Sequence, residues 1–243
     1  MELALVALAV VAGALVKSVT GLGLPLLTIP VLAQVVGVRE AVVVMAPPTL
    51  LANAWMTWRY RAALGMVPNL WRLLAASVAG GIAGAALLER VNERALALVL
   101  AVAVLGYVVR LWRDPDVRLA DRTARRLALP LGLFAGGLQG ATGISGPVVS
   151  TYVHAQRLPR EQFVVAVSAL FGVSGMAQTA TLAGVGLFTP ALLLRAGLAT
   201  AVVAAVMAVG TRVADRLPQA LFERLVLAVL VVSGSKLLWD ALA

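Results

Sequence analysis

The chain has 243 residues, of which 61% are hydrophobic and only 13% are charged. A soluble domain carries about 25% charged residues, so this composition excludes an ordinary water-exposed surface. The lack of cysteine and the single histidine exclude disulfides, thiolate chemistry and multi-histidine metal sites, and we expect no cofactor. The net charge of +9 is dispersed between apolar runs, which favours a lipid bilayer over nucleic acid as the partner. The composition predicts an all-α polytopic membrane protein.

Eight apolar stretches follow one another along the chain, at residues 3–36, 40–58, 67–88, 92–112, 127–157, 162–184, 190–211 and 219–239. Six have the length of about 20 residues that a helix needs to cross a bilayer. The first and the fifth exceed 30 residues and carry Gly and Pro near their centres, which interrupt helices. Because Lys17 follows the first apolar run and no basic residue precedes it, we interpret this run as part of the mature fold rather than a cleaved signal.

The two halves of the chain share an ordered series of residues, which predicts an internal duplication. The matched groups are Thr20-Gly21 with Thr142-Gly143, Pro25 with Pro147, Arg39-Glu40 with Arg160-Glu161, Gly65 with Gly186, Gly106 with Gly234 and Trp112 with Trp239. We assign residues 1–113 to a first transmembrane repeat, 114–126 to a polar linker loop and 127–243 to a second repeat. Each repeat is expected to begin with a broken or re-entrant helix and to continue with three transmembrane helices.

The distribution of Lys and Arg favours an inverted orientation of the two repeats. If each long segment crosses the membrane once, the basic residues divide 11 to 8 between the two sides, which hardly discriminates. If each crosses an even number of times, the division is 14 to 5 and marks one side as cytoplasmic. We favour the second count, which predicts inverted repeats in a prokaryotic inner membrane with the long central loop in the cytoplasm. Re-entrant hairpins, paired spans and kinked helices all stay open for residues 3–36 and 127–157.

The centres of the two long segments are the predicted substrate site. Glycine permits a sharp reversal, and proline fits the first turn of the helix that follows. That helix would begin within the membrane with free N–H groups and the positive end of its dipole, which attract anions. Thr20 and Ser145 are expected to cap these helices or to share their N–H groups with a ligand. The candidate residues are Thr20, Gly21, Gly23 and Pro25 in the first segment, and Thr142, Gly143, Ser145, Gly146 and Pro147 in the second.

Polar residues inside the apolar segments complete the candidate site, because such residues are costly in a membrane. Lys17 and Gln139 lie close to the two interruptions, while Asn53 and Gln178 lie in the next segment of each half. Lys17 could instead snorkel or pair helices, and Asn53 and Gln178 could form interhelical hydrogen bonds. His154 is expected at a helix end. Every Asp and Glu lies at a segment end or in a loop, which argues against a cation substrate and favours a small anion.

The sequence resembles the sulfite exporter TauE/SafE family of membrane permeases. The resemblance covers the whole chain and is most specific from Thr20 to Pro30 and from Gly136 to Pro147, each followed by an Arg-Glu pair. Leu22 and Leu24 interrupt the consecutive glycines that members often show in the first element. The resemblance implies a sulfur-containing anion such as sulfite or a sulfonate.

These observations predict a secondary transporter that moves a small anion by alternating access, and not an enzyme. An anion-selective channel with the same helix-end site is the alternative. The coupling ion, proton or sodium, and the oligomeric state, with a homodimer among the options, stay open.

Overall fold

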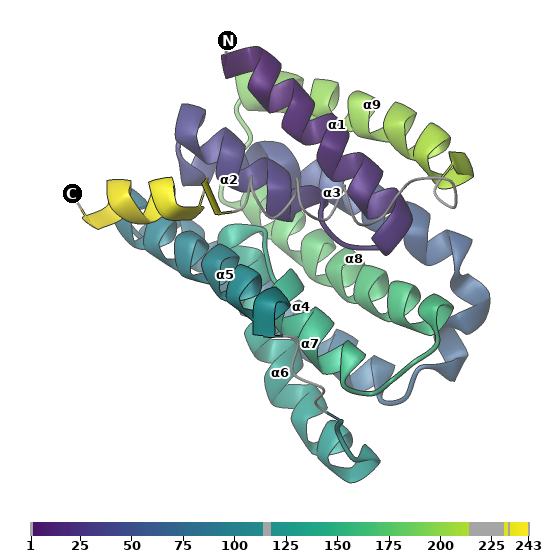
Figure 1. Ribbon diagram of the computed structural model, residues 1–243. Helices are drawn as coiled ribbons and strands as arrows, with labels where there is room; N and C mark the ends of the chain where they lie inside the picture. Colours follow the sequence, from purple (N-terminus) through teal and green to yellow (C-terminus); the bar gives the residue numbers. More distant parts are fainter. Residues whose placement is uncertain (1, 114–117, 214–230, 233, 243) are drawn as a thin grey trace.

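The computed structural model describes residues 2–113, 118–213, 231–232 and 234–242, and within these residues the secondary structure is helical, without strands (Figure 1). Its elements are α1 (Glu2–Thr20), α2 (Leu24–Val36), α3 (Val38–Arg59), the 3-10 helix η1 (Arg61–Met66), α4 (Leu70–Arg90), α5 (Glu93–Arg113), α6 (Asp121–Thr142), α7 (Gly146–His154), α8 (Arg160–Gly184) and α9 (Pro190–Val213). The prediction of an all-α protein is confirmed. Most of the last apolar stretch, 219–239, lies outside the described residues.

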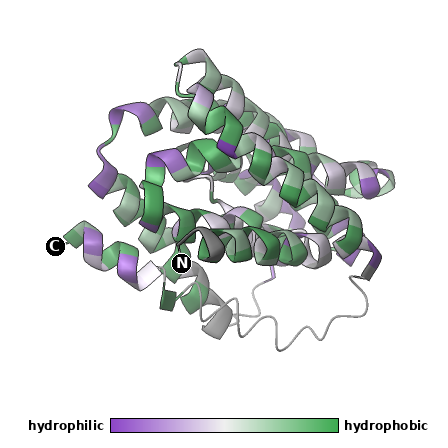
Figure 2. Cartoon of the chain, turned by 90° about the horizontal axis from the view of Figure 1, so that it is seen from above, coloured by the Kyte–Doolittle hydropathy of each residue, from purple (hydrophilic) through white to green (hydrophobic). Residues whose placement is uncertain are grey.

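Three helices of the described part are long and apolar enough to cross a bilayer, namely α4, α8 and α9. They correspond to the predicted stretches 67–88, 162–184 and 190–211. Two shorter helical stretches, Leu5–Ser18 and Leu24–Val36, are also apolar. Apolar residues cover most of the helical surface, and the polar ones gather mainly towards helix ends (Figure 2). This pattern indicates a multi-pass membrane protein.

Both long apolar segments contain a sharp turn between two helices. In the first, α1 ends at Thr20 and α2 begins at Leu24, and the two helices pack against each other. In the second, α6 ends at Thr142 and α7 begins at Gly146. Gly21 and Gly143 adopt positive φ angles of 76° and 71°, which only glycine tolerates without strain. We call residues 20–25 the first tip and residues 142–147 the second tip.

The helix α6 begins earlier than the apolar stretch from which it was predicted. It starts at Asp121, so residues 121–126 of the predicted linker form its first turns. An acidic side chain in the first turn of a helix interacts favourably with the helix dipole, which accounts for a start at Asp121. Of the predicted linker, residues 114–117 lie outside the described part of the chain.

The helix α8 is the central element that positions both tips. In the apolar stretch of α8, 61% of the residues are buried, against 22% in the apolar stretch of α9. The helix α8 packs against α3, α4, α6 and α7. The packing of α4 along α6 is closest at Gly84, where an added methyl group would overlap the carbonyl of Gly137. Close backbone approach through small residues is the usual mode of helix association in membranes.

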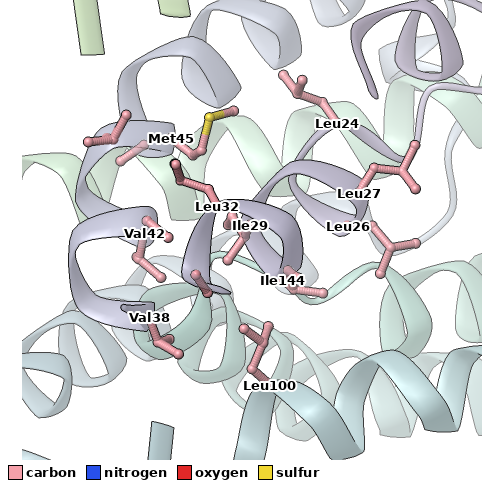
Figure 3. Packing of buried hydrophobic residues seen from close by; sticks show 14 of the residues in the cluster. Leu24, Leu26, Leu27, Ile29, Leu32, Val38, Val42, Met45, Leu100 and Ile144 are labelled. Atoms are coloured by element: carbon pink, nitrogen blue, oxygen red, sulfur yellow. The ribbon is translucent and has the colours of Figure 1, made fainter. Parts of the chain in front are cut away.

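A hydrophobic cluster joins the second tip to the helices of the first half. Ile144 of the second tip belongs to the same buried cluster as Ile29 of α2, Val42 of α3 and Leu100 of α5 (Figure 3). Gly143 lies directly against the Ile29 side chain. Residues far apart in the sequence thus meet around the two tips.

Candidate functional site

The first tip is held by hydrogen bonds to a single threonine and to the last turn of α1. The Thr20 hydroxyl lies 3.0 Å from the Val16 carbonyl oxygen and 3.1 Å from the Leu22 carbonyl oxygen. It accepts a hydrogen bond from the Leu22 N–H at 3.1 Å. The Gly21 N–H donates to the Lys17 carbonyl oxygen at 3.0 Å. Thr20 therefore stabilises the reversal of the chain after α1.

The second tip has the same set of hydrogen bonds. The Thr142 hydroxyl lies 2.8 Å from the Leu138 carbonyl oxygen and 3.1 Å from the Ile144 carbonyl oxygen, and it accepts from the Ile144 N–H at 3.2 Å. The Gly143 N–H donates to the Gln139 carbonyl oxygen at 2.7 Å. The two turns therefore match in their local chemistry as well as in their sequence.

A small cavity of about 10 Å³ lies between the two tips. Its walls come from the first tip and the start of α2, from the second tip and the end of α6, and from one side chain of α8. The wall residues are Leu22, Gly23, Pro25, Leu26, Gln139, Ile144, Ser145, Gly146 and Phe171. This volume is close to the minimum of about 10–15 Å³ that holds one water molecule. The cavity therefore has room for about one water molecule in this structure.

The starts of α2 and α7 bring residues with unpaired backbone N–H groups to this cavity. Within the described residues, the N–H groups of Gly23, Ser145 and Gly146 make no hydrogen bond, and neither helix has a side-chain cap. Of the two roles expected for Thr20 and Ser145, side-chain capping is not observed, and sharing the N–H groups with a ligand stays a prediction. The Thr20 hydroxyl is used within its own turn, and the Ser145 hydroxyl donates to Gln139 Oε1 at 3.0 Å. The free N–H groups remain available to an anion.

Lys17 lies in a buried polar cluster beside the first tip. Its side chain is 1% exposed, so it does not snorkel to the membrane surface. Its ammonium donates to Gly21 O and to Asn53 Oδ1 at 2.5 Å each, and to Ser168 Oγ at 3.3 Å. Its Nζ lies 5.7 Å from the centre of the Phe171 ring. The cluster thus joins α1, α3 and α8.

Gln139 and Gln178 form a second buried polar cluster, beside the second tip. The Gln178 amide, on α8, donates to the carbonyl oxygens of Gln139 and Gly140 at 2.8 and 3.0 Å. Both glutamine side chains are 1% exposed. Gln178 therefore gives the Gln139 carbonyl a second donor beside the Gly143 N–H, and it satisfies the Gly140 carbonyl in the last turn of α6.

The structure divides the sequence-predicted site residues into two groups. Those that line the cavity are Gly23, Pro25, Gln139, Ser145 and Gly146. Those outside the cavity wall are of two kinds. Thr20, Gly21, Thr142, Gly143 and Pro147 belong to the tips themselves, and Lys17, Asn53 and Gln178 form hydrogen bonds beside the tips. His154 is the last residue of α7 and is exposed, away from the cavity.

Two residues of this region carry no signal in the sequence. Phe171 lines the cavity and faces Lys17, and Ser168 accepts a hydrogen bond from Lys17. Both lie within the apolar run of α8, where a phenylalanine and a serine are unremarkable. Only the placement of α8 between the two tips shows that these side chains belong to the site.

Comparison with protein families identifies the chain. A family model described as "Sulfite exporter TauE/SafE" matches residues 5–237, a range that includes both tips and all of the cavity wall. Comparisons with curated proteins and with solved structures gave no significant match. Because the family model covers nearly the whole chain, the protein belongs to the sulfite exporter TauE/SafE family.

Proposed function

We propose that this protein is a secondary transporter that moves a small sulfur-containing anion across the inner membrane by alternating access. Family membership indicates membrane transport of sulfur-containing anions such as sulfite, by transporters rather than enzymes. The substrate site is the cavity between the two tips. The proposal for this chain therefore adds a place for the anion, a mechanism and an orientation in the membrane.

The observation that carries the site is the meeting of two helix N-termini at one cavity. Gly23 at the start of α2 and Ser145 and Gly146 at the start of α7 contribute N–H groups without partners among the described residues. An oxyanion accepts hydrogen bonds from such groups and is favoured by the positive ends of both helix dipoles. The Ser145 hydroxyl supplies a further donor once it turns from Gln139.

The matching chemistry of the tips supports an internal duplication, and the distribution of Lys and Arg supports the inverted orientation of the two repeats. The Thr20 and Thr142 hydroxyls have equivalent partners, and Gly21 and Gly143 have similar φ angles. Inverted repeats let one repeat adopt the conformation of the other, which opens a central site to each side in turn.

Counterflow in proteoliposomes tests the proposal. Vesicles preloaded with unlabelled sulfite should accumulate labelled sulfite from a dilute external solution, and the rate should saturate. A channel would give ionic current without counterflow, and a panel of sulfite, sulfate, sulfonates and carboxylates would define the substrate class. Absence of counterflow for every anion of the panel would contradict the proposed function.

A pair of serine variants tests the position of the site. Ser145→Ala removes a hydroxyl from the cavity wall and should slow counterflow by about tenfold, the effect of roughly 1.4 kcal/mol. Ser150→Ala is the matched control, because Ser150 is a buried serine on α7 whose hydroxyl, among the described residues, contacts the Pro147 carbonyl oxygen at 3.3 Å and does not line the cavity. Equal counterflow rates for the two variants would show that the substrate does not bind between the tips.

The orientation can be measured because the chain has no cysteine. A single cysteine placed at Arg122, near the exposed start of α6, should react with a membrane-impermeant maleimide only from the cytoplasmic side. Labelling from the opposite side in intact cells would reverse the proposed topology.

A further inference from the structure

Lys17 places a basic side chain inside the protein, where it is 1% exposed. Among the described residues, no Asp or Glu forms a salt bridge with it, and its three hydrogen bonds all go to neutral oxygens, on Gly21, Asn53 and Ser168. These acceptors match the three donors of an ammonium group but do not balance its charge. Burying an unbalanced charge within a membrane protein is costly, so such residues usually serve a function.

One helical turn from the Lys17 cluster, α3 carries a buried hydroxyl that has no hydrogen-bond partner among the described residues. The Thr49 hydroxyl is buried and has no partner in the described structure. It lies one helical turn before Asn53, whose side-chain amide donates to the Thr49 carbonyl oxygen at 2.8 Å. Unpaired buried polar groups are uncommon in native structures and call for a specific explanation, such as an absent ion.

The Phe171 ring is the link between this cluster and the cavity. The same ring forms part of the cavity wall and lies 5.7 Å from Lys17 Nζ. Gly21, whose carbonyl oxygen accepts from Lys17, belongs to the first tip. The ammonium therefore lies beside the cavity without being part of its wall. A polyatomic anion is larger than the present cavity of about 10 Å³, so some wall residue must move when it binds.

The two tips differ in charge at one equivalent position. Lys17 and Gln139 each lie three residues before the threonine of their tip, and each accepts a hydrogen bond from the N–H of the glycine that follows that threonine. One carries an ammonium and the other a neutral amide. Lys17 is therefore the basic side chain that distinguishes the first tip from the second.

We propose that Lys17 is the counter-charge for a singly charged anion, and that the Phe171 ring moves aside to let the anion in the cavity meet the Lys17 ammonium. This inference rests on the proposed function and specifies its substrate class as monoanions. Loading then cancels the charge of the site, so the occupied carrier crosses between its two states as a neutral form. An anion with two charges leaves one charge unbalanced at the site.

The voltage dependence of exchange distinguishes this role from a structural one. In exchange between equal anion concentrations only the loaded carrier cycles, so methanesulfonate exchange by the wild-type protein should not respond to a K⁺ diffusion potential set with valinomycin. In Lys17→Gln the loaded form carries one negative charge. Its exchange should be about tenfold to a hundredfold slower, as expected for loss of a charge-assisted hydrogen bond, and should become voltage-dependent.

Two further variants separate charge from folding. Lys17→Arg retains the positive charge and should keep exchange voltage-independent, even if the larger group slows it. Lys236→Gln is the matched control, because Lys236 is exposed and pairs only with Asp240 at 3.0 Å. Voltage-independent exchange in Lys17→Gln at the wild-type rate, or voltage-dependent methanesulfonate exchange in the wild-type protein, would overturn the proposal.

Variants of Phe171 keep the proposal testable if Lys17→Gln does not fold. Phe171→Ala removes the shared wall and should raise the exchange rate of propanesulfonate relative to methanesulfonate by at least about tenfold. Phe134→Ala makes the same change on the exposed side of α6, where Phe134 is 63% exposed, and should leave this ratio unchanged. An unchanged ratio in Phe171→Ala would contradict the role of the ring.

The controls also separate failure of this inference from failure of the proposed function. If the wild-type protein exchanges no anion, the proposed function fails. If it exchanges anions but the Lys17 and Phe171 variants behave as their controls do, the function stands and the inference fails.

Discussion

Replacing Thr142 with valine isolates the hydrogen bond that fixes the second tip. Valine has nearly the same shape as threonine, so the change creates no cavity and removes only the hydroxyl. The Ile144 N–H then loses its acceptor, which lies at 3.2 Å in the present structure. Thr142 and Ile144 are 0% and 1% exposed, so water cannot easily replace the lost oxygen. The variant therefore leaves a buried donor without a partner.

The expected loss of stability follows from the burial of the Ile144 N–H group. A buried polar group deprived of its partner costs roughly 1–3 kcal/mol, so Thr142→Val should lower the free energy of unfolding by about this amount. Thr142→Ser retains the hydroxyl oxygen, so its free energy of unfolding should fall much less. Thr20→Val should cost less than Thr142→Val, because Thr20 is partly exposed. Sulfite counterflow should fall in the same order if the tips form the site.

Thermal unfolding of the purified protein in detergent measures this difference. Thr200→Val is the matched control, since the Thr200 hydroxyl only donates to the Ala196 carbonyl oxygen at 2.7 Å and no N–H group depends on it. We expect the apparent Tm to fall for Thr142→Val and to change little for Thr142→Ser and Thr200→Val. Equal Tm values for Thr142→Val and Thr200→Val would refute the reasoning about the tip.

Two further predictions concern the packing that holds the tips in place. Gly84→Ala should destabilise the protein by about 1–3 kcal/mol or prevent folding, because the new methyl group overlaps the backbone of α6, whereas Gly197→Ala on α9 meets no atom within 4 Å and should be neutral or slightly stabilising. Yields and Tm values of the two variants check this, and similar values would contradict the close contact. Arg39→Ala removes hydrogen bonds to three carbonyl oxygens around the end of α4 and should cost more than Arg195→Ala, which breaks only an exposed ion pair worth about 0–1 kcal/mol. A Tm for Arg39→Ala at or above that of Arg195→Ala would show that these bonds contribute nothing.

The positions of the two turns were predictable from the sequence because their causes are local. A glycine with positive φ and a proline in the first helical turn act within a few residues, and α1 and α6 end at Thr20 and Thr142, next to the predicted interruptions. The start of α6 was less well predicted, since apolarity places it at residue 127 whereas the helix begins at Asp121. Charged residues can form the end of a membrane helix that extends beyond the apolar layer, and an apolar pattern does not reveal them.

The roles of individual polar residues were not predictable, because they depend on partners far away in the sequence. Lys17 lies 151 residues from Ser168, and Gln178 lies 39 residues from Gln139, yet each pair is hydrogen-bonded. The sequence left Lys17 open between snorkelling, helix pairing and ligand binding. The structure excludes snorkelling by burying the side chain between three helices.

The sequence by itself determined that this is an apolar, multi-helical chain of +9 charge, with two interrupted segments and no carboxylate at the centre of any apolar stretch. These properties follow from composition and from short-range geometry. Only the tertiary structure decided that both interruptions face one cavity, that Phe171 forms its wall and that much of the polar chemistry around it comes from α8. The physical reason is that helix packing brings these groups together, and packing depends on side-chain shapes along entire helices rather than on any local pattern.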